Sequence, residues 1–115
     1  MKKEFEQSLI EKLGKDNLKK IRKIHIGIAG AGGLGSNCML NLVRSGFERF
    51  TVVDFDKVDI SNLDRQFYFA DQIGMFKVQA LRVNLLKINP DLELIIFKDN
   101  IVSENIEHLL VLNPD

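Results

Sequence analysis

The chain has 115 residues, of which 45% are hydrophobic and 28% are charged, a composition typical of one globular domain with a packed core. Its 16 basic and 16 acidic side chains balance, so bulk charge favours neither a nucleic-acid partner nor an anionic membrane. A single cysteine, Cys38, excludes an internal disulfide and a paired-cysteine zinc site, and no apolar run reaches the roughly 18 residues of a membrane span. The first residues lack the apolar core of a signal peptide, so we expect a cytoplasmic protein.

The first twenty residues carry hydrophobic side chains at roughly helical spacing among lysines and glutamates. Gly14 interrupts this run, so the pattern predicts one or two short amphipathic helices. We assign residues 1–22 to this helical segment and residues 23–115 to a Rossmann-like domain.

The second unit begins with a strand, a glycine turn and a helix. Residues 23–29 are rich in isoleucine and lead into glycines, which is typical of a buried parallel strand. The helix that follows is predicted to end near Ser45 and Gly46 and to pack Cys38 against the sheet. Its apolar side is predicted to consist of Leu34, Met39, Leu40, Leu42 and Val43.

Residues 50–55 predict a second strand, and residues 56–74 form a polar and aromatic connection long enough to indicate a functional loop. A further helix is predicted from Met75 to the Asn89-Pro90 pair, followed by a third strand over residues 92–97. The aromatic residues predicted to form core beneath the loop are Phe67, Tyr68, Phe69 and Phe76. The alternative is that exposed members of this cluster guide the flexible tail of a partner protein.

The alternation of strands and helices predicts parallel strands joined by right-handed crossovers. We therefore predict an α/β fold, the three-stranded N-terminal half of a Rossmann-like doubly wound sheet. A last helix is predicted from Ser103 to Leu112. Because such a sheet leaves an unpaired edge, we expect the domain to be truncated at its C-terminus or to pair with another chain.

A glycine motif lies between the first predicted strand and its helix. Residues 30–35, GAGGLG, fit the G-x-G-x-x-G turn, whose glycines permit a tight bend and a close approach of backbone N–H groups to a phosphate. Asp54 follows the second strand about 20 residues further on, where an acid normally binds a ribose hydroxyl. Its alternative role is to cap the turn at the strand end. These residues alone fit a dinucleotide-dependent dehydrogenase and an ATP-dependent enzyme equally.

The long loop distinguishes these alternatives. Residues 54–66 read DFDKVDISNLDRQ, after GAGGLGS at residues 30–36 and before IGMFK at residues 73–77 and INP at residues 88–90. In this order and at this spacing, the motifs closely resemble those of the ThiF/MoeB/HesA family of ubiquitin-activating-type adenylyltransferases. The resemblance covers about residues 24–99 and is closest to short bacterial ThiF-type proteins of thiamine biosynthesis.

The resemblance implies that the glycines surround a nucleotide, that Asp54 holds its ribose, and that polar loop residues face its triphosphate. It implies catalytic roles for Arg65, as a bidentate guanidinium, and Lys77, as a mobile positive charge, where negative charge develops in the transition state. The implied nucleotide-binding residues are Gly30, Gly32, Gly33, Gly35, Asp54, Asp56, Asn62, Arg65, Gln66 and Lys77.

The implied reaction is ATP-dependent adenylation of the C-terminal glycine of a ubiquitin-like, ThiS-like sulfur carrier by a homodimeric enzyme. Mg²⁺ is implied as well, with its carboxylate ligand beyond Asp115 and no metal site in the chain itself. The alternatives are an NAD(P)-dependent oxidoreductase, for which the glycine turn and Asp54 suffice, and a non-catalytic fragment that binds a nucleotide or a partner. We expect neither a nucleic-acid nor a membrane partner, and we expect the 115 residues alone to be inactive.

Overall fold

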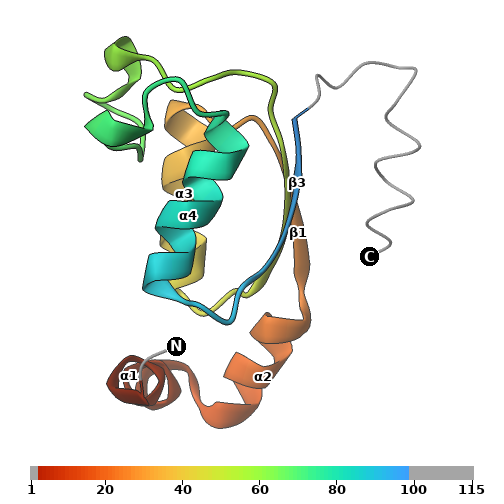
Figure 1. Cartoon of the computed structure of the whole chain (residues 1–115). Helices are drawn as coiled ribbons and strands as arrows, with labels where there is room; N and C mark the ends of the chain where they lie inside the picture. The colour runs from red at the N-terminus through yellow and green to blue at the C-terminus, as the bar shows by residue number, and fades with distance from the viewer. Residues whose placement is uncertain (1–2, 99–115) are drawn as a thin grey trace, which may run out of the picture.

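A computed structural model describes residues 3–98 of the chain (Figure 1). The helices are α1 (Lys3–Leu13), α2 (Lys15–Lys23), α3 (Gly33–Arg44) and α4 (Lys77–Ile88), and the strands are β1 (His25–Ala29), β2 (Arg49–Val53) and β3 (Glu93–Phe97). Two short 3₁₀ helices, η1 (Ile60–Asn62) and η2 (Ala70–Gln72), lie between β2 and α4. The predicted α/β class and order of elements are therefore confirmed, while the helix predicted from Ser103 to Leu112 lies outside the described residues.

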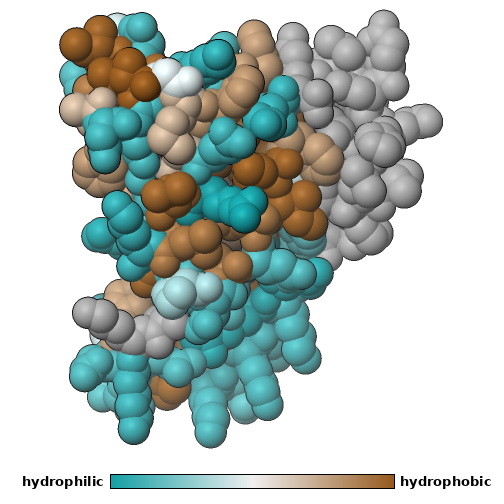
Figure 2. Space-filling model, viewed as in Figure 1, coloured by the Kyte–Doolittle hydropathy of each residue, from teal (hydrophilic) through white to brown (hydrophobic). Residues whose placement is uncertain are grey.

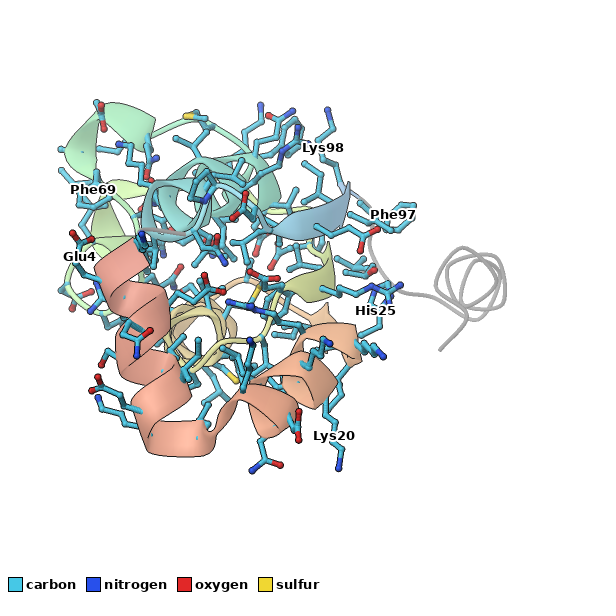
Figure 3. All side chains as sticks on the ribbon, turned by 90° about the horizontal axis from the view of Figure 1, so that it is seen from below. Glu4, Lys20, His25, Phe69, Phe97 and Lys98 are labelled. Carbon is cyan, nitrogen blue, oxygen red and sulfur yellow. The ribbon has the colours of Figure 1, made fainter. Side chains whose placement is uncertain are left out.

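The three strands form one parallel sheet in the order β1-β2-β3. Each crossover between neighbouring strands passes through one helix, and both helices, α3 and α4, lie on the same face of the sheet (Figure 1). Figure 3 shows His25 and Phe97 on the other side of the sheet, away from these helices. The glycine turn, Asp54 and the long loop thus meet at the carboxyl edge of the strands, where parallel sheets bind ligands.

The core lies between the sheet and the two helices. Phe50 and Val52 occupy alternate positions of β2, so their side chains point to the same face of the sheet, the one covered by the helices. Both side chains are fully buried. Their partners from α3 are Met39 and Val43, and those from α4 are Val78, Leu81 and Leu85. This packing fixes the height at which both helices begin, and so positions their N-termini at the carboxyl edge.

The N-terminal segment forms two helices, as the break at Gly14 predicted, and Gly14 adopts a φ of 87° that favours glycine. The side chains of Leu9 and Leu18 are buried and attach the two helices to the rest of the domain near Gly46. Arg22 joins Glu6 of α1, at 2.7 Å, to Glu48 before β2, at 3.4 Å. The α1–α2 end lies opposite the glycine turn, and polar side chains dominate its surface (Figure 2).

Three burial predictions are wrong. Leu34 is 89% exposed because it lies on the side of α3 opposite the buried stripe. Cys38 is also exposed, since the buried stripe of α3 runs through Ser36, Met39 and Val43 and leaves position 38 on another side of the helix. Of the aromatic cluster, Phe69 is 48% exposed. None of the helices within residues 3–98 has the length and apolarity needed to cross a membrane.

Candidate functional site

The glycine turn connects β1 directly to the first turn of α3. Gly30 has a φ of 100°, and its N–H donates to the carbonyl of Val53 across the sheet at 2.7 Å. Gly32 is the N-cap residue of α3, and no side chain caps the helix. The backbone N–H groups of the first turn therefore face the carboxyl edge with the positive end of the helix dipole, an arrangement that favours an anion.

Asp54 joins the glycine turn to the end of β2. Its Oδ2 accepts the N–H of Ala31 at 2.6 Å, and its Oδ1 accepts the N–H of Asp56 at 2.7 Å. The second bond is the strand-end cap that the sequence left as an alternative, and it turns the chain away from the sheet two residues earlier than predicted. A carboxylate offers about four lone-pair sites, so this cap leaves acceptor capacity for ribose hydroxyls.

Lys77 begins α4 and has a side chain that is only 8% exposed. Its Nζ lies 3.9 Å from Oδ2 of Asp56, and its backbone N–H donates to the carbonyl of Asp56 at 2.9 Å. An ordinary surface lysine extends its side chain into water, whereas the side chain of Lys77 is largely buried beside a carboxylate. Lys77 is therefore not an ordinary solvated surface charge.

The two ends of the long loop lie together, which explains how Asp56 reaches Lys77. Lys57 and Phe76 form an antiparallel bridge, and the N–H of Val58 donates to the carbonyl of Met75 at 2.8 Å. The loop therefore leaves the sheet and returns to α4 at the same place. Because its ends are held, its middle can fold over the glycine turn.

Asn62 and Asp59 fold the first part of the loop through reciprocal hydrogen bonds. Oδ1 of Asn62 accepts the N–H of Asp59 at 2.8 Å, while Oδ2 of Asp59 accepts the N–H of Ser61 at 3.0 Å and its hydroxyl at 2.6 Å. The bonds from Ser61, with a smaller contribution from the charge of Lys77, lower the pKa of Asp59. Asn62 therefore stabilises the fold of the loop through its Oδ1. Its side-chain nitrogen, Nδ2, is the group left to donate to a nucleotide.

Arg65 and Gln66 lie over the glycine turn. A Cβ atom on Gly33 would be 3.9 Å from the side-chain stems of both residues. The guanidinium of Arg65 is largely exposed and bonds to Asp64 and to the carbonyl of Ser61, each at 3.0 Å. Among the described residues, Oε1 of Gln66 is a buried atom without a hydrogen-bond partner, which fits a wall that faces a polar ligand.

Asn37 and Ser36 hold this part of the loop on α3. The Asn37 amide donates to the carbonyl of Arg65 at 2.7 Å, and the hydroxyl of Ser36 accepts the N–H of Phe67 at 3.1 Å. The hydroxyl of Tyr68 donates to the carbonyl of Ala31 at 2.5 Å. Sequence reasoning missed Asn37 and identified Tyr68 only as core, because the hydrogen bonds join positions about 30 residues apart.

A buried pair of amides supports the second part of the loop and was also missed. Asn84 of α4 accepts from Nε2 of Gln72 at 2.6 Å and donates to the carbonyl of Phe67 at 3.0 Å, and Gln72 in turn accepts the N–H of Phe69. Asn84 interrupts the apolar stripe of α4 between Leu81 and Leu85. A polar residue in a buried stripe signals such a network.

The predicted metal ligand lay beyond Asp115, and residues 3–98 do not supply a substitute. Within this range, no three side chains of His, Cys, Asp or Glu converge on one point. Asp56 faces Lys77, and Asp59 caps η1. We therefore assign no Mg²⁺ ligand among these residues.

Curated relatives share most of this chain. It is 38% identical over 96 residues to ubiquitin-like modifier-activating enzyme 5 of Branchiostoma floridae, covering 83% of the chain and 24% of that protein. It is 42% identical over 82 residues to SUMO-activating enzyme subunit 2 of Dictyostelium discoideum, covering 70% of the chain and 12% of that protein. The chain thus spans less than a quarter of the length of either relative.

Solved structures share the fold. The Escherichia coli tRNA N6-threonylcarbamoyladenosine dehydratase TcdA, solved in complex with ATP, has a TM-score of 0.87 and 25% identity over 93% of this chain and 44% of its own. Escherichia coli MccB, solved with AMPCPP and MccA, has a TM-score of 0.75 and 28% identity over 81% of this chain and 28% of its own. The fold is therefore the Rossmann-like fold of these nucleotide-bound structures. A family model described as ThiF family matches residues 5–115, and the chain accordingly belongs to the ThiF family.

Proposed function

We propose that this chain is the nucleotide-binding part of an E1-like enzyme that uses ATP to adenylate the C-terminal carboxylate of a ubiquitin-like protein. The observation that carries the proposal is the buried Lys77 side chain, whose ammonium lies 3.9 Å from Asp56 at the same edge as the uncapped N-terminus of α3. An NAD(P)-dependent dehydrogenase would use the glycine turn and Asp54 to bind its cofactor, but it would leave Lys77 without a function. The names of the two curated relatives, which refer to ubiquitin-like modifiers and SUMO, support the choice of substrate.

ATP fits the residues at this edge. Asp54 would accept the ribose hydroxyls with its remaining lone pairs, and the N–H groups of the first turn of α3 would bind phosphate oxygens. Gln66 and Asn62 would form the wall beside the phosphates. The orphaned Oε1 of Gln66 is the polar atom that a bound ligand or its water would satisfy.

The reaction transfers the AMP group to the carboxylate. A carboxylate oxygen attacks the α-phosphorus, the bond from that phosphorus to the bridging oxygen breaks, and pyrophosphate leaves with the electron pair. Negative charge spreads over the phosphate oxygens in the transition state, so fixed cations stabilise it more than they stabilise the substrate. The side chain of Lys77 is fixed by its burial, and Arg65 would approach the phosphates once its exposed guanidinium leaves Asp64 and the carbonyl of Ser61.

The finer proposal is that the substrate is a ThiS-like sulfur carrier of thiamine biosynthesis and that the enzyme acts as a cytoplasmic homodimer. It rests on the resemblance of the motifs to short bacterial ThiF-type proteins. A panel of purified carriers tests it, with pyrophosphate release measured for each. Release with another ubiquitin-like protein and none with the sulfur carrier would overturn this choice.

Calorimetric titration of the chain with ATP and Mg²⁺, and separately with NAD, tests the proposed cofactor. ATP should bind and NAD should not, and Lys77→Ala should weaken ATP binding. Lys87→Ala is the matched control, because Lys87 is exposed near the other end of the same helix. A preference for NAD would establish the dehydrogenase reading instead. ATP binding without pyrophosphate release in the full-length protein, with every carrier tested, would establish the binding-only reading.

A further inference from the structure

The hydroxyl of Tyr68 occupies an unusual place, inside the core and against the backbone of the glycine turn. Tyr68 is 5% exposed and packs within the hydrophobic core cluster. Its Oη donates to the carbonyl oxygen of Ala31 at 2.5 Å. Burial, and then the negative charge of Asp54, raise the pKa of Tyr68, so the hydroxyl keeps its proton and remains a donor.

Hydrogen bonds hold both peptide groups that flank the Cα atom of Ala31. Its carbonyl accepts from Tyr68, its N–H donates to Oδ2 of Asp54 at 2.6 Å, and its side chain is fully buried. In a trans peptide the carbonyl and the following N–H point in opposite directions. Because the Ala31 carbonyl points inward to Tyr68, the N–H of Gly32 points outward, away from the core.

The residues on either side of Ala31 cannot hold this orientation by themselves. Gly30 has a φ of 100°, and Gly32 lacks a side chain that would restrict its φ and ψ angles. The Ala31–Gly32 peptide turns about ψ of Ala31 and φ of Gly32, and a glycine restricts its φ angle little. The hydroxyl of Tyr68 therefore supplies the hydrogen bond that holds the carbonyl of the Ala31–Gly32 peptide in this orientation.

We propose that Tyr68 is a positioning residue of the nucleotide site, whose hydroxyl presents the N–H of Gly32 to a phosphate of the bound nucleotide. This inference rests on the proposed function. The N–H groups of a glycine turn at a helix N-terminus bind phosphates best when they already point at the ligand, because no free energy is then spent on ordering them.

Removal of the hydroxyl alone is a local change. The neighbouring loop residues keep their own links to α3, from Asn37 to the carbonyl of Arg65 and from Phe67 to Ser36. The ring of Tyr68 remains in the core of a Tyr68→Phe variant. The loop should therefore stay in place while the Ala31–Gly32 peptide gains freedom.

The test compares Tyr68→Phe with the wild-type full chain by calorimetric titration with ATP and with adenosine. The variant should bind ATP about tenfold more weakly and adenosine with unchanged affinity, because adenosine lacks the phosphate. Thr51→Val is the matched control, since it removes a buried hydroxyl bonded at 2.9 Å to His25, remote from the turn. It should lower the thermal midpoint and leave both affinities unchanged.

A second measurement needs no ligand. In ¹⁵N–¹H spectra of the free protein, the amide signal of Gly32 should shift or broaden in Tyr68→Phe and stay in place in Thr51→Val. Unchanged ATP affinity, an equal loss of adenosine affinity, or an unmoved Gly32 signal would each overturn the positioning role. Wild-type protein that binds no ATP would instead overturn the proposed function, and the Gly32 signal then decides the orientation of the peptide independently.

Discussion

Gly35 of α3 lies so close to Gly30 at the end of β1 that a Cβ atom on Gly35 would overlap the Gly30 carbonyl oxygen. The position of a Cβ atom is set by the backbone, and the carbonyl of Gly30 is itself backbone, so no rotamer change relieves the overlap. The helix therefore starts directly on the end of the strand, and its first N–H groups reach the carboxyl edge. The last glycine of the motif is required by packing rather than by an unusual φ angle.

Replacement of Gly35 by alanine should lower the free energy of unfolding by about 1–3 kcal/mol, because α3 must move off the strand. Urea denaturation measures this change. Gly27→Ala is the control, since nothing lies within 4 Å of the added Cβ in β1, and its effect should stay within about 0.5 kcal/mol. Equal losses in the two variants would show that the close approach does not matter.

Lys77→Met should reduce ATP–pyrophosphate exchange in the full-length protein by about 100-fold or more, since the variant loses the fixed charge at the proposed phosphate site. Its stability should be kept, because Met fills the same space and Asp56 is half exposed and can be solvated. Thermal unfolding provides the stability measurement, and Lys87→Met provides the matched control. Full exchange activity in Lys77→Met would remove this lysine from the mechanism.

Arg65→Ala should lower the same exchange rate by orders of magnitude and leave the fold intact, since the side chain is 62% exposed and exposed ion pairs contribute little. Circular dichroism and exchange kinetics measure the two effects. Asp64→Ala breaks the same 3.0 Å ion pair and retains the guanidinium. Activity should therefore survive in Asp64→Ala, and an equal loss in both variants would mean that the ion pair itself is needed.

The buried Asn84–Gln72 pair should make a large contribution to stability. Asn84→Leu leaves Nε2 of Gln72 and the carbonyl of Phe67 without their partners, so the variant should lose about 2–3 kcal/mol of unfolding free energy. Arg82→Ala, an exposed change on the same helix, should have little effect. The double variant with Gln72→Leu should lose less than the sum of the single variants. Additive losses would argue against a coupled network.

The stability that the Asp59 carboxylate contributes as the cap of η1 should depend on pH. Hydrogen bonds from Ser61 lower the pKa of Asp59 below its usual value of 3.8. The contribution of this carboxylate to stability is therefore fully present above the unfolded pKa and is lost as the pH falls through the folded pKa. Carboxyl NMR titration should show a higher Asp59 pKa in Ser61→Ala than in wild type, and identical values would contradict this assignment.

The sequence by itself determined the class of fold and the order of its elements. Strand and helix patterns are local, and the break at Gly14, the turn at residues 30–35 and the helix end near Ser45 were identified because glycine and capping residues act on neighbouring backbone. The motifs also identified the family before any geometry was known. Binding roles for the ten residues proposed from these motifs remain predictions.

The tertiary structure decided what those residues do to one another. Burial depends on which elements pack together, so periodicity wrongly assigned Leu34, Cys38 and Phe69 to the interior. Leu34 and Cys38 lie on sides of α3 away from its buried stripe, and the path of the loop leaves Phe69 exposed. Folding of the long loop brings Lys77 to Asp56 and the Tyr68 hydroxyl to Ala31. Hydrogen bonds between residues 20 or more positions apart leave no periodic signal in the chain, and only the packed fold brings their donors and acceptors together.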